Sequence, residues 1–214
     1  MLELGLKFTL AYLIGSIMGA LVVGRLRGGI DIRQMGSGNA GGTNALRTQG
    51  KSFAAGVMLV DVGKGILAAA LIPGLPLPLI GEDPAVPRDL LVHAVALGAI
   101  VGHVFPIWHG FRGGKGGATA AGLVLYLAPG LGSAVVGLWL AIVFVSGIVG
   151  LATISATVAA ALYLGFFGLP ERASLFAFAV LVALLTLFTH RGNIVRMLKG
   201  EESRFPRFFG LGSR

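Results

Sequence analysis

A succession of long apolar segments constrains the fold of this chain more than any other feature. Apolar sequence runs from about Leu4 to Val23, Phe53 to about Ile80, Leu90 to Ile107, Ala118 to Leu169 and Ala173 to Thr189. Charged residues make up only 12% of the chain, against about a quarter in soluble proteins, and the mean hydropathy is +0.87. A helix needs roughly 20 residues to cross a bilayer. We therefore expect an all-α, polytopic integral membrane bundle that forms a single domain over residues 1–214.

Small residues and the absence of cysteine add two constraints. The chain has 35 glycines and no cysteine. Glycine is common in membrane helices because it lets them approach closely, and Tyr12, Gly15, Ser16 and Gly19 have the look of helix-packing positions. We expect the first apolar segment to be a retained span, since no clean cleavage site follows it. Without cysteine, disulfides, thiol catalysis and Cys-ligated zinc are excluded.

Basic residues gather in three polar segments and set the predicted topology. These segments are residues 25–52, 109–118 and 190–214, and the other loops are short and not basic. By the positive-inside rule all three are cytoplasmic, the N-terminus is outside and the C-terminus is cytoplasmic. An odd number of spans follows. The stretch from Ala118 to Leu169 could hold one crossing plus a re-entrant piece or three crossings, and we favour seven spans in total over five, with a short helix from about Gly117 to Ala128. Topology also explains the net charge of +8 better than nucleic-acid binding does.

The first polar segment reads as a donor-rich loop. Between Gly36 and Arg47 it combines two hydroxyls, two carboxamides and one arginine with several glycines, and has no acid. Such a loop suits a phosphate or a polar headgroup, because arginine offers a fork of donors and the smaller groups orient the ligand. The candidate residues are Ser37, Gly38, Asn39, Thr43, Asn44 and Arg47. A turn-rich loop with helix caps is the alternative.

The second polar segment is a glycine loop that follows the apolar run ending at Ile107. Glycine permits positive φ and close backbone approach, and successive N–H groups in such a turn can form an anion nest next to a helix N-terminus. The spacing is not that of a Walker A loop. The candidates are His103, Arg112, Gly113, Gly114, Lys115 and Gly116. A polar turn with a flexible cationic tip is the alternative.

Two further groups of polar residues border or interrupt apolar segments. In a helix, His190, Asn193 and Arg196 would share one face, which could meet a ligand or lie on anionic lipid. Asp61 and Lys64 interrupt the second apolar segment, and ionisable groups in a span suggest a functional site by default. Lys64 is the expected ligand group, and a structural ion pair at i,i+3 is the alternative.

Missing motifs narrow the chemistry. The sequence has no His-x4-Asp pair, no Gly-x-Ser-x-Gly elbow and no His-Glu-x-x-His motif. Its four aspartates, at positions 31, 61, 83 and 89, are too dispersed for a multi-Asp metal site. We therefore expect a cationic, hydrogen-bonding site beside lipid, with no metal and no cofactor.

At the three polar segments the sequence resembles the PlsY family of bacterial membrane glycerol-3-phosphate acyltransferases, which use acyl phosphate as donor. The resemblance lies in Gly-Ser-Gly-Asn-x-Gly-x-Thr-Asn-x-x-Arg at 36–47, His-x-x-Pro and Phe-Arg-Gly-Gly-Lys-Gly at 103–116, and His-x-x-Asn-Ile-x-Arg at 190–196. Asp61-x-x-Lys64-Gly65 also looks like the family's second-helix element. The family often has Val-Ala-Thr where this chain has Gly117-Ala118-Thr119.

The resemblance implies transfer of a fatty acyl group from acyl phosphate to the sn-1 hydroxyl of glycerol 3-phosphate, the first step of bacterial phospholipid synthesis. The products are lysophosphatidic acid and phosphate. It also implies a site at the cytoplasmic face of the bacterial inner membrane, without a covalent intermediate, and a soluble enzyme that supplies acyl phosphate. Acyl phosphate is a mixed anhydride with a good leaving group, so positioning and charge neutralisation suffice for catalysis.

We assign roles on this basis as hypotheses. Lys115 and the amides of Gly113, Gly114 and Gly116 would hold a phosphate, while Ser37, Asn39, Thr43 and Arg47 would bind the acyl-phosphate head. Lys64, His190, Asn193 and Arg196 would orient glycerol 3-phosphate. His190, His103 or a substrate phosphate could accept the hydroxyl proton, and we favour the phosphate because no histidine has an evident carboxylate to orient it. A transporter of a phosphorylated solute and a structural scaffold are the rival functions; against transport, no internal repeat is evident.

Overall fold

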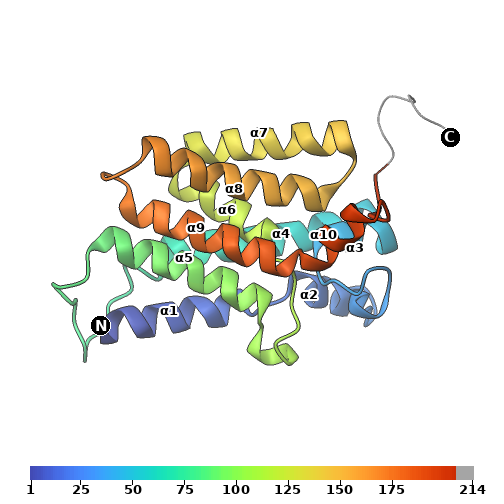
Figure 1. Ribbon diagram of the computed structural model, residues 1–214. Coiled ribbons are helices and arrows are strands. Elements are labelled where there is room, and N and C mark those ends of the chain that lie inside the picture. Colours follow the sequence, from blue (N-terminus) through green and yellow to red (C-terminus); the bar gives the residue numbers. More distant parts are fainter. Residues whose placement is uncertain (206–214) are drawn as a thin grey trace. The chain divides into compact units, whose positions relative to one another are not determined.

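The computed structural model describes residues 1–205, which are helical with no strand. Arg207 and Arg214, two basic residues of the predicted cytoplasmic segment 190–214, lie outside the described residues. The chain divides into two compact units, Met1–Tyr126 and Leu127–Arg214. The all-helical fold expected from the apolar segments is confirmed (Figure 1), while the single-domain expectation stays a prediction.

Unit 1 holds the first polar segment and the glycine loop. Its long helices are α1 (Leu2–Gly15), α4 (Lys51–Leu71) and α5 (Arg88–Val104). Shorter elements surround them: α2 (Gly19–Leu26), the 3-10 helix η1 (Ile32–Gln34), α3 (Gly42–Gln49), the 3-10 helix η2 (Ile107–His109) and α6 (Gly117–Leu127).

Helices α1 and α5 pack backbone to backbone through glycine. A Cβ added at Gly15 would lie 2.1 Å from the Ala99 carbonyl oxygen, and one at Gly102 would lie 2.1 Å from the Tyr12 carbonyl oxygen. The Tyr12 hydroxyl also donates to the Phe105 carbonyl at 2.7 Å. The predicted helix-packing role of Gly15 is therefore confirmed, and glycine is required at both positions because any side chain would overlap backbone.

A buried polar cluster fixes the opposite end of unit 1, far along α1 from the motif loops. The Glu3 carboxylate accepts from Lys7 Nζ at 2.9 Å and from both terminal nitrogens of Arg88 at 2.8 Å. Lys7 also donates to the Pro73 carbonyl, at 2.6 Å. These bonds tie the start of α1 to the end of α4 and the start of α5. The C-terminal end of α5 and the N-terminal end of α4 therefore both lie toward the other end, where the two motif loops are.

The short length of α6 follows from where it starts. Thr119 Oγ1 in its first turn donates to the Asp61 carbonyl at 2.9 Å, and a Cβ at Gly122 would lie 2.8 Å from a Val62 methyl. Asp61 is the middle residue of the 21-residue helix α4. Because α6 begins at this level, its 11 residues, about 16 Å at 1.5 Å per residue, suffice to reach the end of α4. The predicted short helix is thus confirmed.

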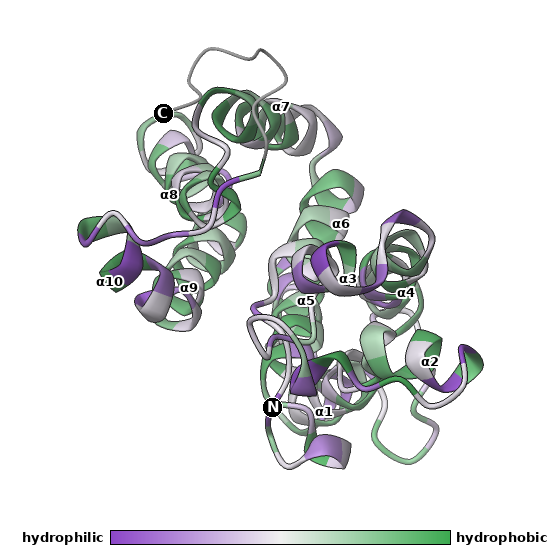
Figure 2. Ribbon diagram, turned by 90° about the vertical axis from the view of Figure 1, so that its right-hand side faces the viewer, coloured by the Kyte–Doolittle hydropathy of each residue, from purple (hydrophilic) through white to green (hydrophobic). Residues whose placement is uncertain are grey.

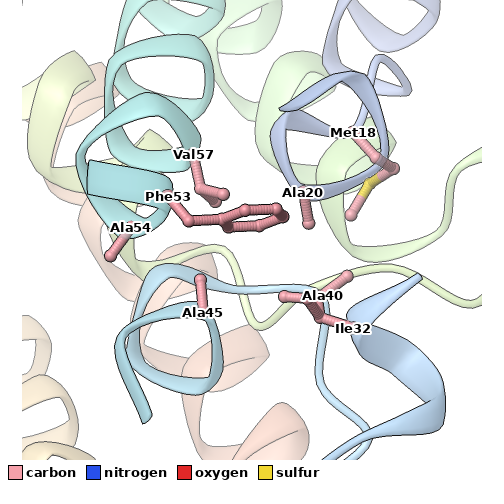
Figure 3. Close-up of a cluster of buried hydrophobic side chains, with 8 residues drawn as sticks. All are labelled: Met18, Ala20, Ile32, Ala40, Ala45, Phe53, Ala54 and Val57. Carbon is pink, nitrogen blue, oxygen red and sulfur yellow. The ribbon is translucent and has the colours of Figure 1, made fainter. Parts of the chain in front are cut away.

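An apolar cluster anchors the first polar segment. Phe53 and Val57 of α4 and Ala20 of α2 contact Ala45 of α3 and Ile32 of η1 (Figure 3). Phe53 is 2% exposed and the other four are fully buried. Burial of this kind contributes about 25 cal/mol per Å² of apolar surface, so this apolar cluster stabilises the position of the polar loop.

Unit 2 contains α7 (Pro129–Ser146), α8 (Val149–Phe167), α9 (Ala173–Thr189) and α10 (Arg191–Leu198). Helix α8 packs against both α7 and α9. Helices α9 and α10 meet at a 60° bend, where His190 separates them. This bend places the third motif at the end of a long apolar helix.

Helix lengths agree with a protein that crosses the membrane several times. In residues 1–205, five helices are long and apolar enough to span, or six if the bent α9–α10 pair counts as one span, and α6 is a shorter apolar helix. The seven-span count and the orientation of the termini stay predictions.

Candidate active site

Asn44 organises the first motif loop from below. Its Nδ2 lies 2.9 Å from the Ile32 carbonyl oxygen and 3.0 Å from those of Met35 and Asn39, and its Oδ1 accepts from the Ser37 N–H at 3.0 Å. The residue is 2% exposed. One amide thus satisfies several backbone groups of a tight loop, as buried polar groups require. A direct contact of Asn44 with substrate stays a prediction.

The other candidate residues of this loop lie closer to its surface. Ser37 and Arg47 are exposed, and Asn39 and Thr43 are partly buried. Asn39 Oδ1 is a buried acceptor with no hydrogen-bond partner in the described residues. In the view of Figure 2, hydrophilic residues colour α3 and the loops of unit 1 beside it, whereas α6 is mainly hydrophobic. The loop therefore offers a polar surface next to apolar helices.

An ion pair stiffens the approach to the loop. Arg33 Nη2 lies 2.8 Å from Asp31 Oδ2, and Arg33 Nε lies 3.0 Å from Oδ1. The Arg33 guanidinium holds the pKa of Asp31 below its ordinary value, and Asp31 in turn raises the pKa of Arg33. Asp31, the only acid in the sequence between residues 25 and 52, is thus paired with a cation.

The glycine loop is fastened to the end of α5 by its own backbone. The Gly113 N–H donates to the Val104 carbonyl at 3.2 Å, and the Gly114 N–H donates to the His103 carbonyl at 3.1 Å. We expected these two amides to hold an anion; each already donates to a carbonyl of α5, and anion binding by them stays a prediction. Gly116 has φ +86°, so its left-handed conformation does require glycine.

Close packing on His103 explains the glycine pair. A Cβ at Gly113 would lie 2.0 Å from the His103 carbonyl oxygen, and one at Gly114 would lie 2.1 Å from His103 Nε2. The imidazole edge therefore faces the loop directly. Lys115, which follows, is partly buried, and Arg112, which precedes the pair, is exposed. Arg112 lies two residues before Gly114, which packs on the His103 ring, and Lys115 lies one residue after it.

Asp61, Lys64 and His103 form a buried polar cluster beneath the glycine loop. Lys64 Nζ lies 2.6 Å from the Ile17 carbonyl oxygen, 2.9 Å from Asp61 Oδ1 and 2.8 Å from His103 Nδ1. Asp61 Oδ1 also accepts from the Gly19 N–H at 3.1 Å. Their exposed fractions are 0% for Asp61, 4% for Lys64 and 2% for His103. The i,i+3 ion pair considered from the sequence is present, and substrate contact by Lys64 stays a prediction.

The same cluster brings a carboxylate close to His103 by way of Lys64, although no carboxylate partner for a histidine was evident from the sequence. Asp61 Oδ1 lies 3.4 Å from His103 Nδ1, with Lys64 Nζ bonded to both groups. The sequence could not reveal this, because residues 61 and 103 are brought together only by the packing of α4 on α5. Asp61 Oδ2 is buried and has no hydrogen-bond partner in the part of the chain that the structure describes.

In unit 2 the third motif is organised by an acid that sequence reasoning did not select. Asn193 Nδ2 donates to Glu202 Oε1 and Arg196 Nε donates to Glu202 Oε2, both at 2.7 Å. Asn193 also packs on Gly150, where a Cβ would lie 3.2 Å from its side chain. The Glu202 side chain is 7% exposed. The sequence signal for this partner is that Glu202 follows Arg196, the arginine of the third motif, by six residues.

His190 is held at the bend between α9 and α10. Its Nδ1 lies 2.9 Å from the Thr186 carbonyl oxygen, which can only accept, so Nδ1 carries a proton. His190 immediately precedes α10, and Asn193 and Arg196 follow within that helix at intervals of three residues. The structure thus brings the first and second motifs to one end of unit 1, and describes the third motif within unit 2.

Comparisons with known proteins agree with this arrangement. A family model described as glycerol-3-phosphate acyltransferase matches residues 6–200. Over 194 residues the chain is 43% identical to a glycerol-3-phosphate acyltransferase of Neisseria meningitidis serogroup C, with 91% of this chain and 93% of the relative covered. It is 42% identical over 203 residues to the enzyme of that name from Rhodospirillum rubrum, covering 95% and 91%.

Solved structures give the same result. A crystal structure of PlsY, an integral membrane glycerol 3-phosphate acyltransferase, in its glycerol 3-phosphate form superposes with a TM-score of 0.80 at 33% identity, covering 95% of this chain and 96% of that one. The lysophosphatidic acid form gives a TM-score of 0.78 at 32% identity, with 95% of both chains covered. This chain is a membrane acyltransferase of the glycerol-3-phosphate acyltransferase (PlsY) family.

Proposed function

We propose that this protein transfers a fatty acyl group from acyl phosphate to the sn-1 hydroxyl of glycerol 3-phosphate, releasing lysophosphatidic acid and phosphate. Family membership supports the acceptor, since relatives are named for glycerol 3-phosphate and PlsY has been crystallised with it and with lysophosphatidic acid. The acyl-phosphate donor and the soluble enzyme that would supply it rest on the sequence resemblance.

One observation carries the proposal: two cationic, donor-rich loops lie at one end of unit 1, beside apolar helices. Arg47 follows the loop that Asn44 organises, and Lys115 follows the glycine pair packed on His103. Two phosphate-bearing substrates need two such cationic positions, and a fatty acyl chain needs apolar helices next to them. This arrangement supports a site at the cytoplasmic face of a bacterial inner membrane, on the orientation that the basic loops predict.

The chemistry that these groups can supply is positioning and charge stabilisation. The hydroxyl oxygen of glycerol 3-phosphate attacks the acyl carbonyl carbon, its proton passes to a substrate phosphate oxygen, the bond from the acyl carbon to the phosphate oxygen breaks, and phosphate leaves. We assign Lys115 and Arg112 to binding a phosphate group at the glycine loop of Gly113, Gly114 and Gly116. This phosphate belongs either to a substrate or to the released product.

The remaining candidates act from the other two motifs. Arg47, with Ser37, Gly38, Asn39 and Thr43, would hold the acyl-phosphate head, and His190, Asn193 and Arg196 would orient the acceptor. Asn44, whose amide is engaged with the loop backbone, would position the first loop.

The experiment is acyl transfer by purified protein in detergent. Palmitoyl phosphate and glycerol 3-phosphate are added, and phosphate and lysophosphatidate are both measured. We expect equimolar products from the parent and a loss of about 10²-fold or more in rate for Lys115→Ala, the size reported for removing one stabilising donor. Lys51→Ala is the matched control, because it removes an exposed lysine outside the proposed site. A parent that releases no phosphate would overturn the proposal and favour the transporter.

A further inference from the structure

The roles considered from the sequence for the buried cluster of Asp61, Lys64 and His103 were substrate contact by Lys64 and proton transfer by His103, and neither uses the cluster as a unit. Its three side chains come from α4 and the end of α5 and meet at the level of the middle of α4. Buried charges are costly unless they are paired and hydrogen-bonded. A cluster of this kind directly below a ligand loop therefore needs a reason beyond packing.

The hydrogen-bond partners of Lys64 determine the tautomer of His103. Lys64 Nζ has three close partners, the Ile17 carbonyl, Asp61 Oδ1 and His103 Nδ1. An ammonium group has three N–H bonds and no lone pair. With Asp61 ionised and accepting the Gly19 N–H, a charged Lys64 makes the buried pair neutral overall. Nδ1 of His103 must then accept, so the ring is neutral and its proton is on Nε2.

The Nε2 edge is the edge that faces the glycine loop. A Cβ at Gly114 would lie 2.1 Å from Nε2, 2.9 Å from Cε1 and 3.1 Å from Cδ2, so the glycine-loop backbone lies against this edge and any side chain at position 114 would overlap the ring. The ring cannot turn away, because Lys64 holds Nδ1 and the residue is 2% exposed. An N–H bond fixed in direction toward the loop that carries Lys115 and Arg112 is suited to a phosphate oxygen.

We propose that the Asp61–Lys64 ion pair locks His103 as an Nε2–H donor that hydrogen-bonds a phosphate group held at the glycine loop. Lys64 and Asp61 are then positioning residues that act through His103, and Lys64 does not contact substrate. The inference rests on the proposed function for the source of the phosphate, which is either substrate or released product. It adds a neutral, fixed donor to the cations of the loop.

The first test does not depend on turnover. Protein labelled with [15N]histidine is studied by NMR at pH 7, with the resonances of His103 identified as those missing from His103→Gln among the four histidines. We expect one neutral tautomer with the proton on Nε2, both before and after addition of inorganic phosphate, and a shift of the Nε2 resonance on addition. A proton on Nδ1, an imidazolium, or a tautomer that changes when phosphate binds would overturn the proposal. The last outcome would indicate that Lys64 leaves His103 to bind phosphate itself.

The second test removes the lock while keeping the fold. Lys64→Met alone leaves Asp61 buried and unpaired, so we use Asp61→Asn with Lys64→Met, since replacing both members of a buried pair is tolerated better than breaking it. We expect a mixture of His103 tautomers and phosphate binding about 10- to 100-fold weaker, the range for a lost hydrogen bond to a charged group. Unchanged phosphate affinity with a single Nε2–H tautomer would refute the lock.

The matched control is the buried pair at the far end of unit 1. Glu3→Gln with Lys7→Met removes an ion pair of similar burial that touches neither motif loop. We expect the parental His103 spectrum and parental phosphate affinity in this variant. If it weakens phosphate binding as much as the Asp61/Lys64 variant does, the effect is one of general stability and the proposal fails. If the parent protein shows the Nε2–H tautomer of His103 but catalyses no acyl transfer, this result counts against the proposed function and leaves the tautomer proposal standing.

Discussion

Replacing Gly114 with alanine tests how tightly the glycine loop is seated on His103. The new Cβ would lie 2.1 Å from Nε2, whereas carbon and nitrogen atoms normally stay about 3.5 Å apart. A displacement of about 1.4 Å, the difference of these two distances, is therefore required. The ring is buried and bonded to Lys64, so we expect the loop to move away from α5.

The expected cost to catalysis is large compared with the cost to folding. A misplacement of about 1 Å can lower a rate by about 10²-fold, while overpacking typically costs about 1–3 kcal/mol of stability. We expect Gly114→Ala to remain folded, by its melting curve in detergent, and to lose about 10²-fold in kcat/KM for acyl transfer. Gly63→Ala is the control: a Cβ there meets nothing within 4 Å, so activity is retained and the α4 helix is stabilised by about 0.5–1 kcal/mol. Parental activity in Gly114→Ala would refute the close seating of the loop.

Three further predictions concern charges. Glu3→Gln leaves Lys7 buried without its carboxylate, which costs about 3–5 kcal/mol, so the melting temperature falls clearly. Glu3→Gln with Lys7→Met is expected to recover part of this loss, since Arg88 still lacks its carboxylate; equal melting of the two variants would contradict the Glu3–Lys7 pairing. Glu202→Gln weakens the hold on Asn193 and Arg196 and is expected to raise the KM for glycerol 3-phosphate about 10-fold at nearly constant kcat, measured by initial rates. Because Arg33 lowers the pKa of Asp31, the pair stabilises the folded protein above the unfolded pKa of about 3.9 and loses this effect as pH falls through the folded value. Asp31→Asn therefore costs up to about 1 kcal/mol at pH 7 and progressively less as the pH is lowered below the unfolded pKa, measured by chemical denaturation across this range.

The membrane fold could be predicted because hydropathy is a local property of the sequence. Each predicted apolar segment contains a helix, and even the 11-residue helix after the glycine loop was expected. The reason for its length was not accessible, since it depends on Thr119 reaching Asp61 of α4. Sequence patterns give the extent of a helix, and only packing gives the level at which it starts.

The candidate site was predictable in its composition and less so in its hydrogen bonding. The motif residues of unit 1 lie in two loops and in the helix segments next to them, but the amides of Gly113 and Gly114 are engaged with α5, which no spacing rule reveals. Likewise Asn44 looks like any other donor of its loop until its four backbone partners are seen. Residue type predicts which groups can bind an anion, whereas the folded backbone decides which of them are already occupied.

The two motif histidines have opposite tautomers, and this bears on the proton acceptor in the proposed reaction. His190 Nδ1 donates to the Thr186 carbonyl, so Nε2 of the neutral ring carries the lone pair; His103, by the argument above, carries its proton on Nε2. His103 is therefore removed from the candidate bases, and His190 or a substrate phosphate remains. A carbonyl at Nδ1 is neutral and stabilises an imidazolium less than a carboxylate does, so we still favour the phosphate.

Replacing His190 with glutamine decides between these two acceptors. Glutamine keeps hydrogen-bonding capacity but cannot take up a proton near neutral pH. If substrate phosphate is the base, kcat falls by less than about 10²-fold, and most of the effect is in KM because His190 then only orients the acceptor. General-base catalysis contributes about 10²- to 10⁴-fold. A loss of about 10⁴-fold in kcat with KM unchanged would therefore establish His190 as the base and refute the phosphate mechanism, whereas the same loss in His103→Gln alone would contradict the tautomer assigned to His103.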